Sequence, residues 1–379
     1  MTAGTAFEWP LCHQPPLGGT VIKYLGSKRV LVPRILAAIG AIPQTRRVLD
    51  LFCGTARVGH ALKRAGYYVI ANDHLAYAAT LGRCYVQADA KRLQGRLPKI
   101  IEHLSGVEPC AGYFTETFCV RSRFFHPRNG ERIDGIREEI ERLGLDPVSK
   151  AVVLVSLMEA ADRVDSTTGV QMAYLKTWAA RALKPLELRM PAILAGPGEA
   201  HQLDAEDAAA LISVDVAYLD PPYNQHRYLG NYHIWESLAL WDKPSVYGIA
   251  CKRVDCRDYK SGFNSRPGIL PALVGVLNRL KSRWTIVSFN NEGYIDQASM
   301  TSLLMAFGHV EAVEVDFKRY VGAQIGIHNP QGIRVGTVSH VRNKEYLYFV
   351  GPEREVLRRM AEAAQLGPAT EQLGLFGVG

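Results

Sequence analysis

The sequence lacks the signals of several large classes of protein. Its 379 residues contain seven cysteines, an odd number with no Cys-x-x-Cys pair, which argues against a disulfide framework and against a structural zinc site. No stretch reaches about 18 uninterrupted apolar residues, and the first residues lack a basic start followed by an apolar run. We therefore expect neither a membrane span nor a secretory signal peptide. Unpaired thiols fit a reducing, cytoplasmic compartment.

Two phosphate-binding motifs are also missing. No G-x-x-x-x-G-K-[ST] segment occurs, which argues against a P-loop, and there is no full G-x-G-x-x-G of the kind found in nicotinamide-dependent enzymes. The composition itself is ordinary, since 47% hydrophobic and 21% charged residues exclude a disordered or fibrous chain. The length allows about two to three domain-sized units. A net charge of +7 is compatible with an anionic partner but is too small to identify one.

Apolar spacing divides the chain into a sheet-forming part and a helix-rich part. A strand over 47–52, a small-residue turn, a helix over 60–65 and a strand over 67–71 form a βαβ unit. Strand patterns then vanish until about residue 190 and return over 214–219, 283–289, 310–317 and 345–350, with a Gly-rich hairpin or loop over 318–344. We predict one sheet-based domain with an α-rich insertion, divided as a flexible arm (1–20), a first catalytic part (21–110), the insertion (111–190), a second catalytic part with the hairpin (191–360) and a flexible tail (361–379).

The turn after the first strand permits close approach of a ligand. Small residues occur from Gly54 to Gly59 at the carboxyl end of the strand, where a backbone without side chains can approach a bound molecule. Asp73 ends the next strand, 23 positions after Asp50, and an acid there can accept hydrogen bonds from ribose hydroxyls. The acid at Asp50 disfavours a pyrophosphate and suits a cationic, adenosine-containing cofactor such as S-adenosylmethionine. For this motif alone, a plain tight turn is the open alternative.

A second segment, Asp220-Pro221-Pro222-Tyr223, directly follows the apolar strand over 214–219. Two prolines fix the backbone and remove two N–H donors, which leaves a rigid turn that presents a carboxylate and bare carbonyls. Such acceptors can hold a planar amino group and draw off the positive charge that builds on its nitrogen during attack. Tyr223 can stack on a flat ring. The combination favours a catalytic turn over an ordinary strand-ending turn.

The ordered set of motifs resembles the adenine-specific DNA methyltransferases of the Dam-like alpha group, over about residues 20 to 350. That family has an aromatic-x-Gly-x-Lys motif, a cofactor glycine turn, a target-recognition insertion and then an Asp-Pro-Pro-Tyr turn. The matching segments here are, in that order, Tyr24-Leu-Gly26-Ser-Lys28, Asp50-Leu-Phe52-Cys-Gly54 and Asp220–Tyr223. The insertion and the stretch after the turn look most similar to methyltransferases that partner type IIS restriction enzymes. The resemblance implies a Rossmann-like α/β methyltransferase sheet that uses S-adenosylmethionine and no metal.

The resemblance also implies which residues bind the cofactor. Those beside its methionine end and the catalytic turn would be Tyr24, Gly26 and Lys28, and those lining it would be Asp50, Phe52 and Gly54. Asp73 would bind the ribose.

Two further positions follow from the same resemblance. Asp204, 16 positions before Asp220, matches the family acid that contacts the adenine amine of the cofactor. Asp89 competes for that role, although its neighbourhood looks like a solvated helix. Ala56 stands where the family often has glycine, so we expect a slightly altered turn rather than lost binding.

The implied reaction is methyl transfer to the exocyclic amine of adenine in duplex DNA. A base inside a duplex cannot reach a pocket, so the target adenine is expected to flip out. Asp220 and the Pro221 carbonyl would accept hydrogen bonds from its amine, on a turn that Pro222 helps to fix, and Tyr223 would stack on the ring. Positioning and electrostatics would carry the catalysis. Open alternatives are methylation of a cytosine amine, of RNA or of a glutamine amide, and a catalytically silent DNA-binding module.

DNA contacts are expected where basic residues gather. Residues 251–344 contain 13 Lys and Arg against 7 Asp and Glu, whereas residues 113–190 contain 12 against 11. Phosphate contacts supply most of the affinity, so the later stretch would bind the DNA backbone and the insertion would read bases. The candidate contacts are Arg121, Arg123, His126, Arg128, Lys252, Arg253, Lys318, Arg319, Arg334, Arg342 and Lys344.

The tail contains Gln372-Leu373-Gly-Leu375-Phe376, which resembles the peptide by which bacterial DNA-processing proteins dock on the replicative sliding clamp. An extended tail would place its leucines and phenylalanine in an apolar groove, with the glutamine amide at the rim. Packing of the tail on its own domain is the open alternative. The expected partners are double-stranded DNA, a cognate restriction endonuclease and the sliding clamp, but no membrane. The expected location is the cytoplasm, on DNA, for a protein encoded by a bacterium or a phage.

Overall fold

The computed structural model describes residues 22–26, 28–93, 95–167, 169–318, 327–328, 334–336 and 342–367. Its centre is a seven-stranded sheet with the order β3-β2-β1-β4-β7-β11-β8. The strands are β1 (Arg47–Asp50), β2 (Tyr68–Asn72), β3 (Gly198–His201), β4 (Ser213–Leu219), β7 (Lys281–Asn290), β8 (His309–Lys318) and β11 (Arg342–Gly351). The pairs from β3 to β7 are parallel, and β11 is antiparallel to both of its neighbours. The predicted Rossmann-like α/β sheet is confirmed.

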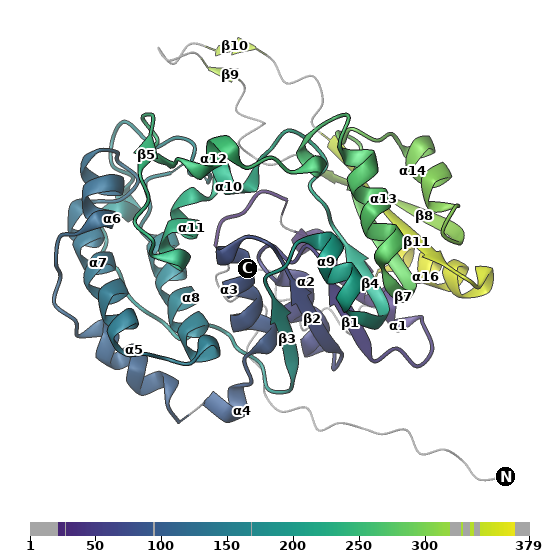
Figure 1. The fold of residues 1–379 in the computed structure, drawn as a ribbon, viewed down its shortest axis with the longest axis horizontal. Helices are drawn as coiled ribbons and strands as arrows, with labels where there is room; N and C mark the ends of the chain where they lie inside the picture. Colours follow the sequence, from purple (N-terminus) through teal and green to yellow (C-terminus); the bar gives the residue numbers. More distant parts are fainter. Residues whose placement is uncertain are drawn as a thin grey trace.

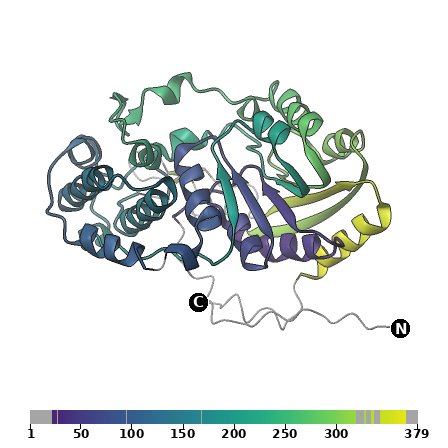
Figure 2. The same ribbon diagram turned by 60° about the horizontal axis from the view of Figure 1, so that its bottom comes forward.

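Helices cover both faces of the sheet (Figure 2). Alternate residues of a strand point to opposite faces, so Val48 of β1 packs in one apolar cluster and Leu49 in the other. The helices on the Val48 side are α1 (Val32–Gly40), α2 (Arg57–Arg64), α3 (Ala76–Gly82) and α16 (Arg354–Leu366), and those on the Leu49 side are α9 (Ala205–Leu211), α13 (Ile269–Arg279) and α14 (Gln297–Leu304). A strand can be buried on both faces only in such a layered arrangement.

A helical lobe lies at one side of the sheet, inserted between β2 and β3 (Figure 1). Its helices beyond α3 include α4 (Ala90–Leu93), α5 (Leu97–Ser105), α6 (Tyr113–Thr115), α7 (Pro127–Arg142) and α8 (Pro147–Arg163). Helix α8 is apolar on nearly all sides and buried, as expected for the centre of a helical unit. Asp146 caps it by accepting hydrogen bonds from the Val148 and Ser149 amides. The predicted start of the insertion at residue 111 stays a prediction, and helices α4 and α5 precede it.

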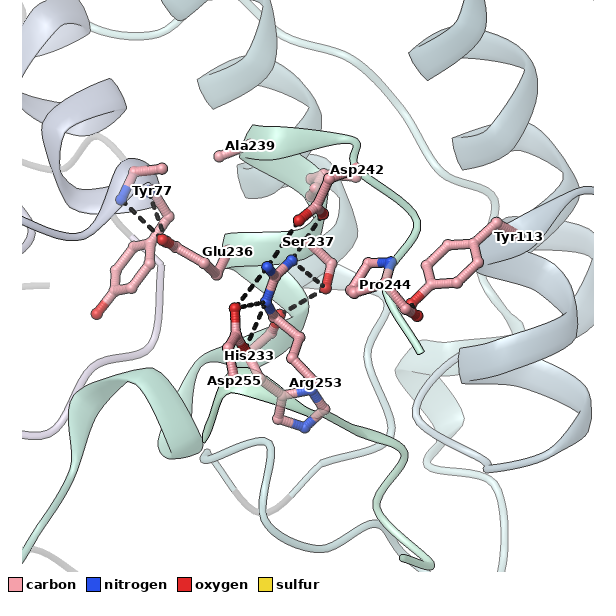
Figure 3. A network of polar contacts seen from close by, with 12 residues as sticks. Tyr77, Tyr113, His233, Glu236, Ser237, Ala239, Asp242, Pro244, Arg253 and Asp255 are labelled. Atoms are coloured by element: carbon pink, nitrogen blue, oxygen red, sulfur yellow. Dashed lines mark hydrogen bonds and ion pairs between the residues drawn. The ribbon is translucent and has the colours of Figure 1, made fainter. Parts of the chain in front are cut away.

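A buried network joins this lobe to the sheet domain (Figure 3). The segment after β4 forms α10 (Tyr228–Asn231), α11 (His233–Leu240), the hairpin of β5 (Val246–Tyr247) and β6 (Lys252–Arg253), and α12 (Asp255–Asp258). On α11, the Glu236 carboxylate accepts hydrogen bonds from the Ala76 and Tyr77 amides, which begin α3. The Tyr113 hydroxyl of the lobe donates to the Pro244 carbonyl over 2.9 Å. The same segment that follows the catalytic turn therefore fixes the lobe in place.

The stretch after β8 and strand β3 differ in how well the sequence predicts them. Most of the stretch over 318–344, expected as a hairpin or loop, lies outside the described residues; β11 pairs with β8 from Arg342 opposite Lys318 onward, and the short β9 (Ile327–His328) and β10 (Arg334–Gly336) pair with each other. Strand β3 was not predicted. Its four residues, Gly-Glu-Ala-His, have low strand propensity and are half-buried at the sheet edge, so they show neither alternation nor an apolar run. No helix in the described ranges is long and apolar enough to cross a membrane.

Candidate active site

The predicted catalytic and cofactor residues meet at one edge of the sheet. Asp50 ends β1, Asp73 follows β2 and Asp220 follows β4. Because these strands are parallel, their carboxyl ends lie at the same edge, and β1 and β4 border the point where the strand order reverses. A cavity of about 990 Å³, including its open mouth, lies there. All eight residues predicted to bind the cofactor line it: Tyr24, Gly26, Lys28, Asp50, Phe52, Gly54, Asp73 and Asp204.

The glycine turn is held by the two acids that flank it. Asp73 accepts a hydrogen bond from the Gly54 amide over 3.0 Å, and Asp50 accepts one from the Gly59 amide over 2.9 Å. Gly54 has φ +49°, and a Cβ there would lie 3.3 Å from the Tyr24 hydroxyl, so both conformation and space favour glycine. Ala56 also has a left-handed backbone, with φ 56°, and it is fully buried. The turn thus keeps a glycine-like conformation at an alanine.

Burial raises the pKa values of both of these acids. Desolvation raises the pKa of Asp50 to about 7, against the lowering effect of the Gly59 hydrogen bond, and the negative charges of Asp220 and Asp73 raise it further. The pKa of Asp73 is also raised by burial, although His74 and three backbone amides oppose the shift. A buried carboxylate with a raised pKa gains most from a positively charged ligand. The cavity therefore favours a cation beside the glycine turn.

The predicted catalytic turn interacts with two other charged residues. Lys28 Nζ lies 3.0 Å from Asp220 Oδ1 and also donates to Glu345 Oε1. Burial raises the pKa of Asp220 to about 6, against the attraction of Lys28, with a further increase from Glu345. The pKa of Lys28 is raised well above its ordinary value, because the two carboxylates outweigh the desolvation that would lower it. Sequence reasoning missed Glu345, which lies 125 positions after Asp220 and carries no motif.

The rest of the turn lies partly outside the cavity lining. Asp220 and Pro222 line the cavity, whereas Pro221 is buried behind it. The Tyr223 ring packs edge-on against Phe289, with ring centres 5.7 Å apart, and its carbonyl accepts a hydrogen bond from the Tyr294 amide over 2.9 Å. The turn is therefore fixed by neighbouring strands and loops.

Aromatic side chains form a wall that the motifs did not reveal. Tyr24 stacks on Tyr228, with ring centres 5.3 Å apart, and on Tyr232, at 4.7 Å. The His74 ring stacks on Tyr259 at 4.9 Å, and both line the cavity. The only sequence signal was the polar and aromatic character of residues 224–233.

Arg57, a cation in the cavity lining, forms no ion pair with an acid among the described residues. Arg57 begins α2, directly after the glycine turn, and lines the cavity. Its Nε is buried without a hydrogen-bond partner within the described part of the chain. Burial lowers its pKa, and the nearby positive charge of Arg29 adds to this effect. Such a guanidinium suits an anionic group on a bound ligand.

The two candidates for the adenine contact differ in position. Asp204 lines the cavity and caps α9 by accepting a hydrogen bond from the Glu206 amide over 2.9 Å. Asp89 is not among the cavity residues, and it accepts hydrogen bonds from the Lys91 and Gly196 amides. The geometry therefore favours Asp204.

Three of the predicted DNA-binding residues make contacts within the protein. Arg253 is a correction, because its guanidinium is buried and forms ion pairs of 2.7 Å with both Asp242 and Asp255, so it fixes the fold rather than a phosphate (Figure 3). Lys252 is half-buried, with Nζ 2.8 Å from the Met172 sulfur. Arg123 lies 4.6 Å from the centre of the Trp178 ring and donates to the Lys176 carbonyl.

His126 is half-buried and caps α7 by accepting a hydrogen bond from the Arg128 amide, and most of the other predicted positions are either at the surface or outside the described residues. Arg121 and Arg128 are exposed on the lobe. Arg319 and the tail residues Gln372, Leu373, Leu375 and Phe376 lie outside the described residues, as do the side chains of Lys318, Arg334 and Arg342. Among the described residues, no cluster of three or more His, Cys, Asp and Glu side chains has the geometry of a metal site.

Comparison with known proteins agrees with this geometry. Type II methyltransferase M.NlaIII from Neisseria lactamica is 29% identical over 341 residues, which cover 86% of this chain and 100% of that protein. Modification methylase StsI from Streptococcus sanguinis is 28% identical, and type II methyltransferase M.FokI from Planomicrobium okeanokoites is 29% identical; they align with 79% and 78% of this chain. The chain spans 49% and 48%, respectively, of those two longer proteins.

The sequence profile of one family matches residues 24–265, from the Tyr24 motif through the glycine turn to beyond the Asp-Pro-Pro-Tyr turn. Its description is D12 class N6 adenine-specific DNA methyltransferase. The predicted adenine methyltransferase activity, with S-adenosylmethionine as methyl donor, is thereby confirmed. The chain belongs to the D12 class N6 adenine-specific DNA methyltransferases.

Proposed function

We propose that the turn Asp220–Tyr223 holds an adenine flipped out of duplex DNA while its exocyclic amine is methylated. One observation carries this assignment: Asp220 borders the same cavity as all eight predicted cofactor residues. The Asp220 carboxylate and the Pro221 carbonyl accept hydrogen bonds from the amine, and Tyr223 stacks on the base. The packing of buried Pro221 and half-buried Tyr223 keeps these acceptors in place.

The cavity residues fit S-adenosylmethionine by their chemistry. The cofactor supplies a methyl group activated by a positive sulfur. The acids Asp50 and Asp73 provide negative charge near the glycine turn. Asp73 accepts hydrogen bonds from the ribose hydroxyls, and Asp204 contacts the adenine amine of the cofactor. Arg57 provides the positive charge that a methionine carboxylate needs, because Lys28 is already paired with two carboxylates. This division of charge supports the use of the cavity as the cofactor site.

DNA is proposed to cross the carboxyl edge of the sheet, with the helical lobe reading bases through Arg121, Arg123 and Arg128. The structure adds Arg266, which is exposed and lies 5.4 Å from the centre of the Tyr294 ring. The Tyr294 amide donates a hydrogen bond to the Tyr223 carbonyl of the catalytic turn, so the Arg266 guanidinium lies near the expected position of the flipped base. It is a better phosphate contact than Arg253.

The partners and the cellular location are also proposed, from the family, its relatives and the sequence. A cognate restriction endonuclease is a proposed partner, because named relatives are type II and modification methylases. Docking of the tail on a sliding clamp rests on residues 372–376 alone. A DNA substrate and unpaired thiols support work in the cytoplasm.

The test combines product analysis with one variant. Wild-type protein, S-adenosylmethionine with a labelled methyl group and duplex DNA should give labelled N6-methyladenine in nucleoside digests. Asp220→Ala should abolish transfer while cofactor binding, measured by calorimetry, is largely kept. Asp207→Ala at an exposed position of α9 is a matched acidic control and should leave turnover unchanged. Label in N4-methylcytosine, in RNA or in protein would support the alternatives, and normal turnover of Asp220→Ala would refute the assignment.

A further inference from the structure

Three charged side chains from distant parts of the chain meet beside the catalytic turn. Lys28 precedes α1, Asp220 follows β4, and Glu345 lies near the start of β11. Lys28 contacts both carboxylates, at 3.0 Å from Asp220 Oδ1 and by a short hydrogen bond to Glu345 Oε1. Glu345 is 2% exposed, whereas the Asp220 side chain is 19% exposed and borders the cavity. The Glu345 carboxylate is thus buried away from the cavity, and the Asp220 carboxylate faces a ligand bound there.

Glu345 is fixed by strand β7. Ser288 donates to Glu345 Oε1 over 2.8 Å, and Asn290 donates to Oε2 over 3.2 Å. These two residues are buried, and Glu345 pairs directly with Asn290 in the sheet. Glu345 is not among the cavity residues, whereas Lys28 and Asp220 are, so these two residues connect it to a bound base.

The charges do not balance in this triad. One ammonium group lies between two carboxylates, which leaves one negative charge in excess beside the reacting amine. A simple Lys28–Asp220 pair would be neutral, and the Lys28 ammonium would then pair with Asp220 alone. Buried charges are costly unless they are paired, so an excess buried carboxylate has to be explained by more than packing.

We propose that Glu345 is a positioning residue for methyl transfer, which shares Lys28 with Asp220 and thereby leaves Asp220 basic enough to accept the proton of the methylated amine. This inference rests on the proposed function of the catalytic turn. In the transfer, the amine lone pair forms the new N–C bond while the S–C bond electrons leave with sulfur. The amine nitrogen then carries a positive charge and releases one proton, and Asp220 takes it.

The titration of Asp220 responds to every charged or titratable group that faces it. Asp220 has a pKa of about 6, raised mainly by burial, lowered by Lys28 and raised by Glu345. Removal of the Glu345 charge should therefore lower the Asp220 pKa. The groups around Asp220 and its partners are Lys28, Glu345, Asp50, Tyr218, Tyr223 and Tyr228.

The experiment measures the rate of N6-methyladenine formation in single turnovers across pH 4.5 to 9, with saturating duplex and cofactor. Wild type should lose activity below about pH 6, as Asp220 becomes protonated. Glu345→Gln should shift this acidic limb down by about one pH unit and lower the plateau rate, because a weaker base accepts the proton. The Gln side chain keeps the size and one hydrogen-bond acceptor of Glu345.

Two variants separate charge from structure. Glu345→Asp retains the charge, and Ser288→Ala removes one hydrogen bond to Glu345 without changing charge. Both should leave the acidic limb at its wild-type pH even if the melting temperature falls. An unshifted limb in folded Glu345→Gln, or equal shifts in all three variants, would overturn the role of Glu345. Lack of N6-methyladenine with wild type would instead refute the proposed function.

Discussion

Asp50 provides a direct test of the electrostatics of the cofactor cavity. It is 1% exposed, and burial raises its pKa from 3.8 to about 7. The native protein therefore binds a proton at Asp50 more tightly than the unfolded chain does. Stability must then fall as pH rises from about 4 to about 7, and the loss should total about 4 kcal/mol above pH 7. Asp50→Asn removes this penalty and can still accept the Gly59 hydrogen bond.

The measurable quantity is the difference in unfolding free energy between Asp50→Asn and wild type. By the same linkage, that difference should be about 2 kcal/mol more stabilising at pH 8.5 than at pH 5.5. Urea unfolding of the cofactor-free proteins at the two pH values measures it, and the shifts of other acids cancel in the comparison. A difference that does not change with pH, or that becomes less favourable at high pH, would refute the reasoning.

Three further outcomes follow from the geometry. Tyr223→Ala should weaken binding of a duplex with the target adenine by about 1–3 kcal/mol, with little effect on a duplex that has an abasic site there, as measured by titration; equal losses on both would contradict base stacking. Arg57→Gln should reduce the preference for S-adenosylmethionine over its decarboxylated analogue by about 1.5–3 kcal/mol in calorimetry, whereas equal weakening of both ligands would indicate a structural role. Arg253→Met should lower the unfolding free energy by about 3 kcal/mol without changing the salt dependence of DNA binding; a reduced salt slope would restore Arg253 as a phosphate contact.

The sequence was enough to select eight residues that line one cavity and are predicted to bind the cofactor. Several of these residues lie in short segments directly after strands, such as Asp50 and Gly54 after β1. Such segments combine an apolar strand with a turn signal, and parallel strands necessarily bring their carboxyl ends to one edge. The cavity positions of Tyr228 and Tyr259 were not specified, because an aromatic residue outside a strand-turn motif has no sequence signal that separates a cavity wall from an ordinary core contact.

The basic residues show where local sequence information ends. Arg253 and Arg266 belong to the same basic stretch, and nothing in their neighbours distinguishes them. The fold buries Arg253 between Asp242 and Asp255 and leaves Arg266 exposed beside Tyr294. Counting charges predicts a net excess, but the direction of each side chain depends on elements that pack from elsewhere in the chain.

The sequence by itself determined the α/β fold and revealed the glycine turn and the Asp-Pro-Pro-Tyr turn, because each is encoded within one strand and the turn that follows it. Only the tertiary structure decided that Lys28 would be shared by Asp220 and Glu345. Lys28 and Glu345 are 317 positions apart, and they meet because β11 is antiparallel to β7. That reversal places the beginning of β11 at the edge where the parallel strands end, and no local pattern specifies which strand will be its neighbour.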